Sequence, residues 1–120
     1  DAQRHLNNVK YFVFIEHARV AYLREVGLWD GYDFDTIGMI VAEATCTYLA
    51  PAYLGETVTV WTRVSHLGNK SFHFEFRLAT GRGEIATGRT VQVCYDYAAG
   101  QSIPMPEEWR QAFVAYEPGL

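Results

Sequence analysis

The sequence is poor in the residues from which metal-bound and disulfide-bonded domains are built. Its 120 residues contain only two cysteines, Cys46 and Cys94. Both stand inside strand-like runs, and neither has a second cysteine or a histidine at metal-ligand spacing. We therefore expect no zinc site, no other metal site and no disulfide scaffold. Two buried free thiols, as found in a reducing compartment, are expected instead.

Positive charge is scarce as well. Ten lysines and arginines face fourteen aspartates and glutamates, which gives a formal net charge of -4. A protein that binds nucleic acid neutralises phosphates with clustered cations, and the sequence has no such cluster. The composition argues against a nucleic-acid partner and favours a small molecule or another protein.

Long uninterrupted apolar runs are also missing. The longest apolar stretch, residues 9–26, contains six charged or titratable side chains: Lys10, Glu16, His17, Arg19, Arg24 and Glu25. That content is too polar for a membrane span, and the sequence opens with no signal-peptide pattern. We expect a cytoplasmic protein with no membrane partner.

Apolar residues are nevertheless abundant, at 49% of the chain with 15% aromatic residues. A chain of 120 residues with this composition can bury a substantial core as one domain. We expect a single domain over residues 1–120.

Residues 9–26 predict the one long helix. Twelve of these eighteen residues are apolar, none is glycine or proline, and Gly27 follows as a natural stop. The apolar side chains are spread around most of the helix circumference, which predicts a helix that is mostly buried.

The remainder of the chain predicts an antiparallel sheet. A turn-rich segment at 29–38 is followed by strand patterns at 39–48, 57–65, 71–78 and 84–97, and a short helix is predicted over 106–116. Alternation is clearest at 71–78, where Phe72, Phe74 and Phe76 share one face. Small residues at 86, 88 and 90 would let the helix approach the last strand closely. Short turns at 67–70 and 80–83 indicate a meander.

One helix cannot cover both faces and both edges of such a sheet. Exposed strand edges are sites of association, so we expect two copies to pair through an edge.

Chemistry-bearing residues gather immediately before the long helix. Asp1, His5, Asn7 and Asn8 all precede or begin it. A helix start carries unpaired N–H groups and the positive end of the helix dipole, so it can stabilise an oxyanion while Asp1 acts as base or nucleophile. Capping is the alternative interpretation, with Asn7 or Asn8 as N-cap and Asp1 and His5 as ordinary loop residues.

Taken together, these motifs resemble the hotdog-fold acyl-CoA thioesterases of the 4-hydroxybenzoyl-CoA thioesterase type. That family opens with D-x-D-x-x-G-H-x-N-N-x-x-Y and continues with E-x-A-R on the helix. The matching residues here are Asp1, His5, Asn7, Asn8, Tyr11, Glu16, Ala18 and Arg19. Segments 48–52, 55–56, 67–71 and 86–89 match as well.

The resemblance implies an α+β hotdog fold, in which a curved antiparallel sheet wraps a long central helix. Two features depart from the family pattern. Arg4 replaces the glycine before the histidine, and we expect the printed sequence to lack the N-terminal strand that precedes the aspartate in the family. The family also assembles homodimers or homotetramers, the latter as dimers of dimers.

The reaction implied by the resemblance is hydrolysis of an acyl-CoA to a carboxylic acid and free coenzyme A, with no cofactor beyond the coenzyme A of the substrate. Asp1 matches the catalytic carboxylate, as nucleophile or as general base. The backbone N–H of Asn8 matches the group that binds the thioester oxygen. His5 belongs to the same catalytic motif.

Further residues are implied for substrate binding, namely Asn7, Tyr11, Lys70, Ser71 and Arg89. Lys70 is the first candidate for the phosphates of coenzyme A. Glu16 is the alternative carboxylate, because a related hotdog branch uses a helix glutamate; otherwise it pairs with Arg19.

Two other functions remain open. A catalytically silent hotdog module would bind an acyl group or a partner protein, and Arg4 favours it. An acyl dehydratase is disfavoured, because that branch pairs its aspartate and histidine differently along the helix. The acyl class and the tetramer arrangement are not readable from the sequence.

Overall fold

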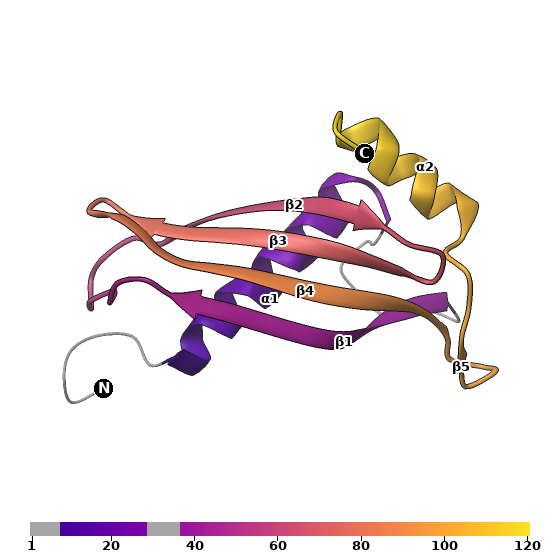
Figure 1. Cartoon of the computed structure of the whole chain (residues 1–120), viewed down its shortest axis with the longest axis horizontal. Coiled ribbons are helices and arrows are strands. Elements are labelled where there is room, and N and C mark those ends of the chain that lie inside the picture. Colours follow the sequence, from indigo (N-terminus) through magenta and orange to yellow (C-terminus); the bar gives the residue numbers. More distant parts are fainter. Residues whose placement is uncertain (1–7, 29–36) are drawn as a thin grey trace.

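The computed structural model describes residues 8–28 and 37–120, which form two helices and five strands (Figure 1). The longer helix lies across one face of the sheet, and the shorter one packs at one end (Figure 1). The elements are α1 (Asn8–Glu25), β1 (Ile37–Tyr48), β2 (Thr59–Leu67), β3 (Ser71–Thr80), β4 (Gly83–Asp96), β5 (Gln101–Ser102) and α2 (Glu107–Tyr116).

All described strand pairs are antiparallel, and the strand order is β1-β4-β3-β2, with the short β5 paired to the end of β4. The predicted meander of three consecutive strands is confirmed for β2, β3 and β4. β1 does not pair with β2, the next strand in sequence, but with β4. Among the described strands, β1 and β2 therefore form the two sheet edges.

The predicted long helix is confirmed to within one residue at each end. Gly27 adopts a positive φ of 80°, which glycine reaches without steric cost. The N–H of Gly27 donates to the carbonyl of Arg24 at 3.1 Å and that of Leu28 to the carbonyl of Leu23 at 3.0 Å. This pair of bonds is the Schellman arrangement, which satisfies carbonyls left over at the helix end.

The predicted burial of α1 around most of its circumference is wrong for the single chain. Its buried side chains form one stripe: Tyr11, Ile15, Tyr22 and Leu23. Phe12 and Val13 remain 37% and 39% exposed. The sheet covers only one side of the helix, so apolar residues on the other side face solvent.

The core lies between α1, α2 and the inner face of the sheet. Phe72, Phe74, Phe76 and Leu78 are each at most 2% exposed, which confirms the face predicted from their alternation. The Phe72 ring lies 4.8 Å from the ring of Phe113 on α2. The prediction of a terminal helix is confirmed, with Pro106 just before it.

Gly88 marks the closest approach of α1 to the sheet. A Cβ atom there would lie 2.8 Å from Cδ1 of Ile15 and 3.1 Å from the carbonyl oxygen of Thr45. The prediction that small residues on β4 allow close helix packing is therefore confirmed.

Two smaller predictions need correction. Cys94 is a buried free thiol as expected, whereas Cys46 is free but only partly buried, because it lies on the edge strand β1. Most of the turn-rich segment, residues 29–36, falls outside the described residues; Ile37 and Gly38 already belong to β1.

Candidate functional site

The start of α1 stands where the sequence predicts it. The helix begins at Asn8, so the backbone N–H groups of its first turn have no partner within the helix. No acidic residue occurs in that turn of the described helix, so no carboxylate of the turn itself offsets the positive end of the helix dipole. Asp1, His5 and Asn7, like Arg4, lie outside the described residues, and only the backbone of Asn8 is described.

Tyr11 connects this helix start to the end of β1. Its side chain is 2% exposed, and its ring meets that of Tyr48 edge-on at a centroid distance of 4.9 Å. Tyr48 is 39% exposed and leads into a loop that also exposes Leu49 and Leu54. An aromatic and apolar surface thus adjoins the helix start.

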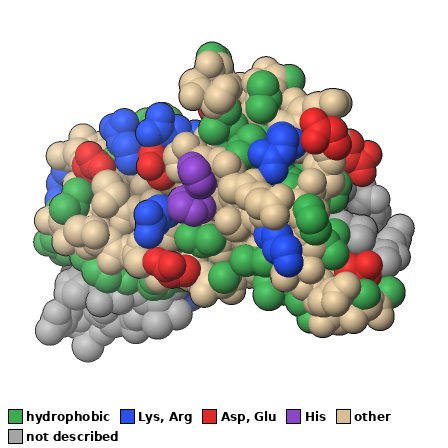
Figure 2. Space-filling view, turned by 45° about the vertical axis from the view of Figure 1, so that its right-hand side comes forward, with side chains coloured by type: hydrophobic (Ala, Val, Ile, Leu, Met, Phe, Trp, Pro, Cys, Tyr) green, Lys and Arg blue, Asp and Glu red, His purple; other side chains and the backbone are tan. Residues whose placement is uncertain are grey.

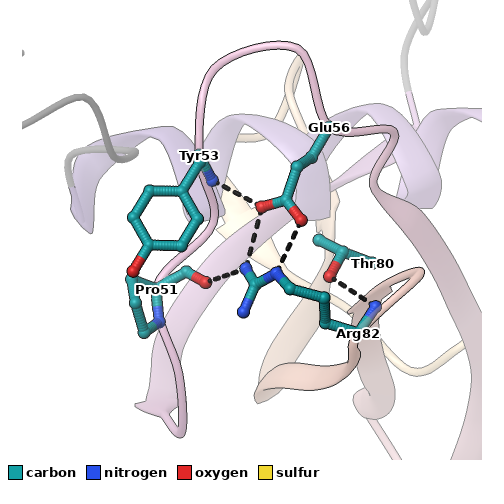
Figure 3. Close-up of polar contacts among 5 residues, drawn as sticks. All are labelled: Pro51, Tyr53, Glu56, Thr80 and Arg82. Atoms are coloured by element: carbon teal, nitrogen blue, oxygen red, sulfur yellow. Dashed lines mark hydrogen bonds and ion pairs between the residues drawn. The ribbon is translucent and has the colours of Figure 1, made fainter.

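An ion pair clamps this loop to the β3–β4 turn (Figure 3). The Arg82 guanidinium donates from Nε and Nη2 to the two carboxylate oxygens of Glu56, each at 2.8 Å, and Nη2 also donates to the carbonyl of Pro51 at 2.8 Å. The Glu56 carboxylate also accepts the N–H of Tyr53 at 2.7 Å. The hydrogen bond from Arg82 is the main cause that lowers the pKa of Glu56 to about 2.

Sequence reasoning noted Gly55-Glu56 as a matching segment and 80–83 as a turn, but it missed that the two are joined. Glu56 and Arg82 are 26 positions apart, so no local pattern links them. The only signal for this ion pair in the sequence was that the charged Glu56 follows Gly55 in a turn.

Lys70 and Ser71 lie at the other end of the sheet. The Lys70 ammonium lies 3.5 Å from the hydroxyl of Ser102, and its side chain is exposed. Ser71 is opposite Val93 on β4, whereas Tyr48 is opposite Ala86, seven positions away on the same strand. At strand rise this is about 23 Å. Within one chain these predicted substrate contacts are far from the helix start.

Arg89 points to the outer face of the sheet, opposite α1. It lies across from Glu75 on β3, and its Nη2 is 3.4 Å from the Glu43 carboxylate. Alternation along β4 accounts for this, because Gly88 and Thr90 occupy the inner face. The structure therefore does not bring Arg89 together with the helix start of the same chain.

Glu16 is exposed on α1, and Arg19 is partly buried. Burial lowers the pKa of Arg19, and the charge of Glu16 opposes that shift. The structural pairing of the two residues stays a prediction.

Neither metal ligands nor a membrane span stand out in the part of the chain that the structure describes. It contains no group of three or more His, Cys, Asp or Glu side chains placed to hold a metal ion. Within residues 8–28 and 37–120, no helix has the length and hydropathy needed to cross a bilayer.

Residues 1–113 match the sequence profile of the Thioesterase-like superfamily. The chain belongs to the Thioesterase-like superfamily. The predicted resemblance and the predicted hotdog fold are both confirmed. The sheet and both helices follow the predicted plan, although the sheet does not enclose α1.

One curated relative is similar to this Thioesterase-like chain over about two thirds of its length. A 1,4-dihydroxy-2-naphthoyl-CoA hydrolase of Synechococcus elongatus is 26% identical over 82 residues, which are 66% of this chain and 60% of that protein. The chain thus spans less than two thirds of the length of this curated relative.

Two solved structures are similar over almost the whole chain. A gentisyl-coenzyme A thioesterase is 27% identical with a TM-score of 0.84, covering 94% of this chain and 90% of its own. A thioesterase from Thermus thermophilus, solved in complex with coenzyme A and zinc, is 29% identical with a TM-score of 0.84, covering 98% and 85%.

Proposed function

We propose that this protein is an acyl-CoA thioesterase that hydrolyses a thioester to a carboxylic acid and free coenzyme A. The observation that carries the proposal is the position of α1. The helix begins at Asn8, directly after the Asp1, His5 and Asn7 positions that match the thioesterase motif. Membership of the Thioesterase-like superfamily supports the same reaction.

In the proposed mechanism, Asp1 acts as general base or as nucleophile. As a base it takes a proton from water, whose oxygen attacks the thioester carbon while the carbonyl oxygen becomes negative. The N–H of Asn8 and the dipole of α1 stabilise that oxyanion. The C–S bond then breaks, and the thiolate of coenzyme A receives the proton. His5 and Asn7 hold the loop that carries Asp1. No cofactor takes part in this scheme.

As nucleophile, the Asp1 carboxylate itself attacks, and an acyl-enzyme anhydride forms as the thiolate leaves. Water then hydrolyses the anhydride and regenerates the carboxylate. Both routes need the same oxyanion site at the start of α1.

We place an aromatic acyl group beside Tyr11 and Tyr48. The two rings meet edge-on, and that of Tyr48 is exposed. Because they lie next to the proposed oxyanion site, they suit a flat apolar ligand. Two similar proteins are named for aromatic acyl-CoA substrates, the 1,4-dihydroxy-2-naphthoyl-CoA hydrolase and the gentisyl-coenzyme A thioesterase.

The phosphates of coenzyme A are placed at Lys70 and Ser71. Coenzyme A is an extended ligand whose phosphates lie far from its thioester, so distant contacts belong to one substrate. Two copies paired through the exposed edge of β1 form the proposed working unit, a homodimer or a dimer of such dimers.

The decisive experiment measures thiol release from aromatic, short-chain and long-chain acyl-CoAs by the full-length protein. We expect turnover, fastest on aromatic substrates. Asp1→Asn should lower kcat at least about a hundredfold without unfolding the protein. Glu16→Gln is the matched control and should lose little activity. Equal losses in both variants would contradict the assignment to Asp1.

Lys70→Ala tests the phosphate contact. Loss of one exposed cation should raise KM for acyl-CoA about three- to tenfold and leave kcat near the wild-type value. The control is Arg24→Ala, which removes an exposed cation from the C-terminal end of α1. An unchanged KM for Lys70→Ala would show that this contact is wrongly placed.

A silent binding module is the second candidate, because Arg4 stands where the thioesterase motif has glycine. This function requires binding of coenzyme A or an acyl chain without turnover on any substrate of the panel. Arg4→Gly should then restore hydrolysis, because a glycine lets the loop adopt conformations that a side chain prevents.

A further inference from the structure

A groove of about 630 Å³ crosses the outer face of the sheet, on the side opposite α1. Figure 2 turns part of this face toward the viewer, with cationic and acidic side chains interspersed around a histidine pair. The groove is lined by Thr45, Thr47, Trp61, Thr62, Arg63, Glu75, Phe76, Arg77, Thr87, Gly88 and Arg89. Of the predicted substrate-binding residues, this lining contains Arg89, and the proposed reaction does not use it.

The strand register shows how the groove is built. One wall is a cross-strand row of outward side chains: Trp61, Arg77, Thr87 and Thr47. The other wall is the adjacent row: Arg63, Glu75, Arg89 and Thr45. Inward-facing positions of the same strands form the floor. Because neighbouring strands are about 4.8 Å apart, the groove extends about 14 Å across the three gaps from β2 to β1.

An aromatic platform stands at the β2 end of the groove. The Trp61 side chain is 51% exposed, and the Arg77 guanidinium carbon lies 5.5 Å from the centroid of its ring. An indole ring beside a guanidinium offers a stacking surface for a flat heterocycle.

Hydroxyl and guanidinium donors stand at the other end. Thr45, Thr47 and Thr87 bring three hydroxyl groups beside Arg89. An arginine with neighbouring hydroxyl donors is a group that recognises phosphate oxygens. In the middle of the groove, the Glu75 carboxylate can accept hydrogen bonds from sugar hydroxyls.

The lining has three guanidinium groups and one carboxylate, and each guanidinium has a carboxylate partner within 4 Å. Arg63 is tightly paired with Glu75 at 2.7 Å. Arg77 and Arg89 reach their partners Glu84 and Glu43 only at 3.7 Å and 3.4 Å. Exposed pairs of this kind contribute little, and both arginines keep donors for an anion.

We propose that this groove binds a nucleoside phosphate. The base stacks on Trp61 beside Arg77, the ribose lies over Glu75, and the phosphates reach Arg89 and the threonine hydroxyls. The length of the groove suits a free nucleoside diphosphate, because the phosphates of coenzyme A are already placed at Lys70 and Ser71, outside this lining. Because the groove and α1 occupy opposite faces of the sheet, this site is separate from the proposed oxyanion site.

Isothermal titration of the full-length protein with ADP, adenosine, inorganic phosphate and coenzyme A tests the proposal. ADP should bind with a Kd below about 1 mM, and adenosine and phosphate each at least about tenfold more weakly, since each lacks one half of the contacts. Trp61→Ala and Arg77→Ala should each weaken ADP binding about tenfold, whereas Trp61→Phe should retain much of it.

Val114→Ala, on the exposed side of α2, is the control and should bind ADP like the wild type. Coenzyme A should not compete with ADP, because its phosphates are placed at Lys70 and Ser71. Competition that depends on Trp61 would show that the groove holds the substrate itself and would overturn a separate nucleotide site. Absence of ADP binding, or ADP binding insensitive to Trp61→Ala and Arg77→Ala, would overturn the proposal. Thiol release is measured separately, so failure of the groove and failure of the thioesterase are distinguishable.

Discussion

Gly88 shows how one residue controls the distance between α1 and the sheet. Its missing side chain leaves room for Ile15, which is 1% exposed. We expect Gly88→Ala to destabilise the protein by about 1–3 kcal/mol, because the new methyl group would overlap Ile15 and the Thr45 carbonyl. Ile15→Val in the same chain should recover part of that loss. Denaturant unfolding measures both.

Gly81→Ala is the matched control, since nothing lies within 4 Å of the Cβ position at Gly81. Its stability should change little. An equal loss at both glycines would show that backbone freedom, and not contact with Ile15, is the cause.

His73 makes stability depend on pH. Burial, then the neighbouring His66 and Arg89, lower the pKa of His73 below its ordinary 6.5, against a smaller opposing effect of Glu43 and Glu75. The unfolded chain therefore binds more protons than the folded one just below pH 6.5, and stability falls as the pH drops through that window. His73→Gln should flatten this dependence in denaturant unfolding from pH 7.5 to 5. His17 is exposed on α1, and His17→Gln should leave the pH dependence of stability unchanged.

At the scale of elements, Glu117 joins the end of α2 to α1 and to the edge strand β2. One carboxylate oxygen accepts the Tyr22 hydroxyl at 2.7 Å and the Val64 N–H at 3.1 Å. Glu117→Ala should cost about 1–3 kcal/mol of stability, because both donors lose their partner. The control is Glu25→Ala, at the exposed end of α1, which should leave the free energy of unfolding unchanged.

Combining Glu117→Ala with Tyr22→Phe tests the connection further. The two losses should not add, because both variants break the same hydrogen bond. Additive losses, or unchanged hydrogen-exchange protection of the Val64 amide in Glu117→Ala, would contradict the proposed junction.

At the scale of the whole molecule, β1 is a twelve-residue edge strand that exposes Ile40 and Val41 at 42% and 43%. A long apolar edge is a site of strand pairing between copies. We expect the wild type to sediment as a dimer or tetramer and Val41→Lys to shift it toward smaller species, because a buried charge at the interface is costly. Val114→Lys, exposed on α2, should keep the wild-type state. A monomeric wild type would contradict edge pairing.

Local patterns in the sequence determined much of the fold. Alternation at 71–78 predicted the buried face of β3, Gly27 predicted the end of α1, and small residues on β4 predicted the close packing at Gly88. These features depend on residues near one another in the chain, so backbone periodicity and glycine chemistry suffice to predict them. For the candidate site, the position of the helix start was predicted in the same way, while the roles of Asp1, His5 and Asn7 stay predictions.

Tertiary structure alone decided the rest. It paired β1 with β4, put Lys70 far from the helix start, directed Arg89 to the outer face, and joined Glu56 to Arg82. Strand order and cross-strand register bring together residues that are distant in sequence, and no local pattern records such contacts. The groove between two rows of outward side chains exists only through that register, which is why the sequence alone could not reveal it.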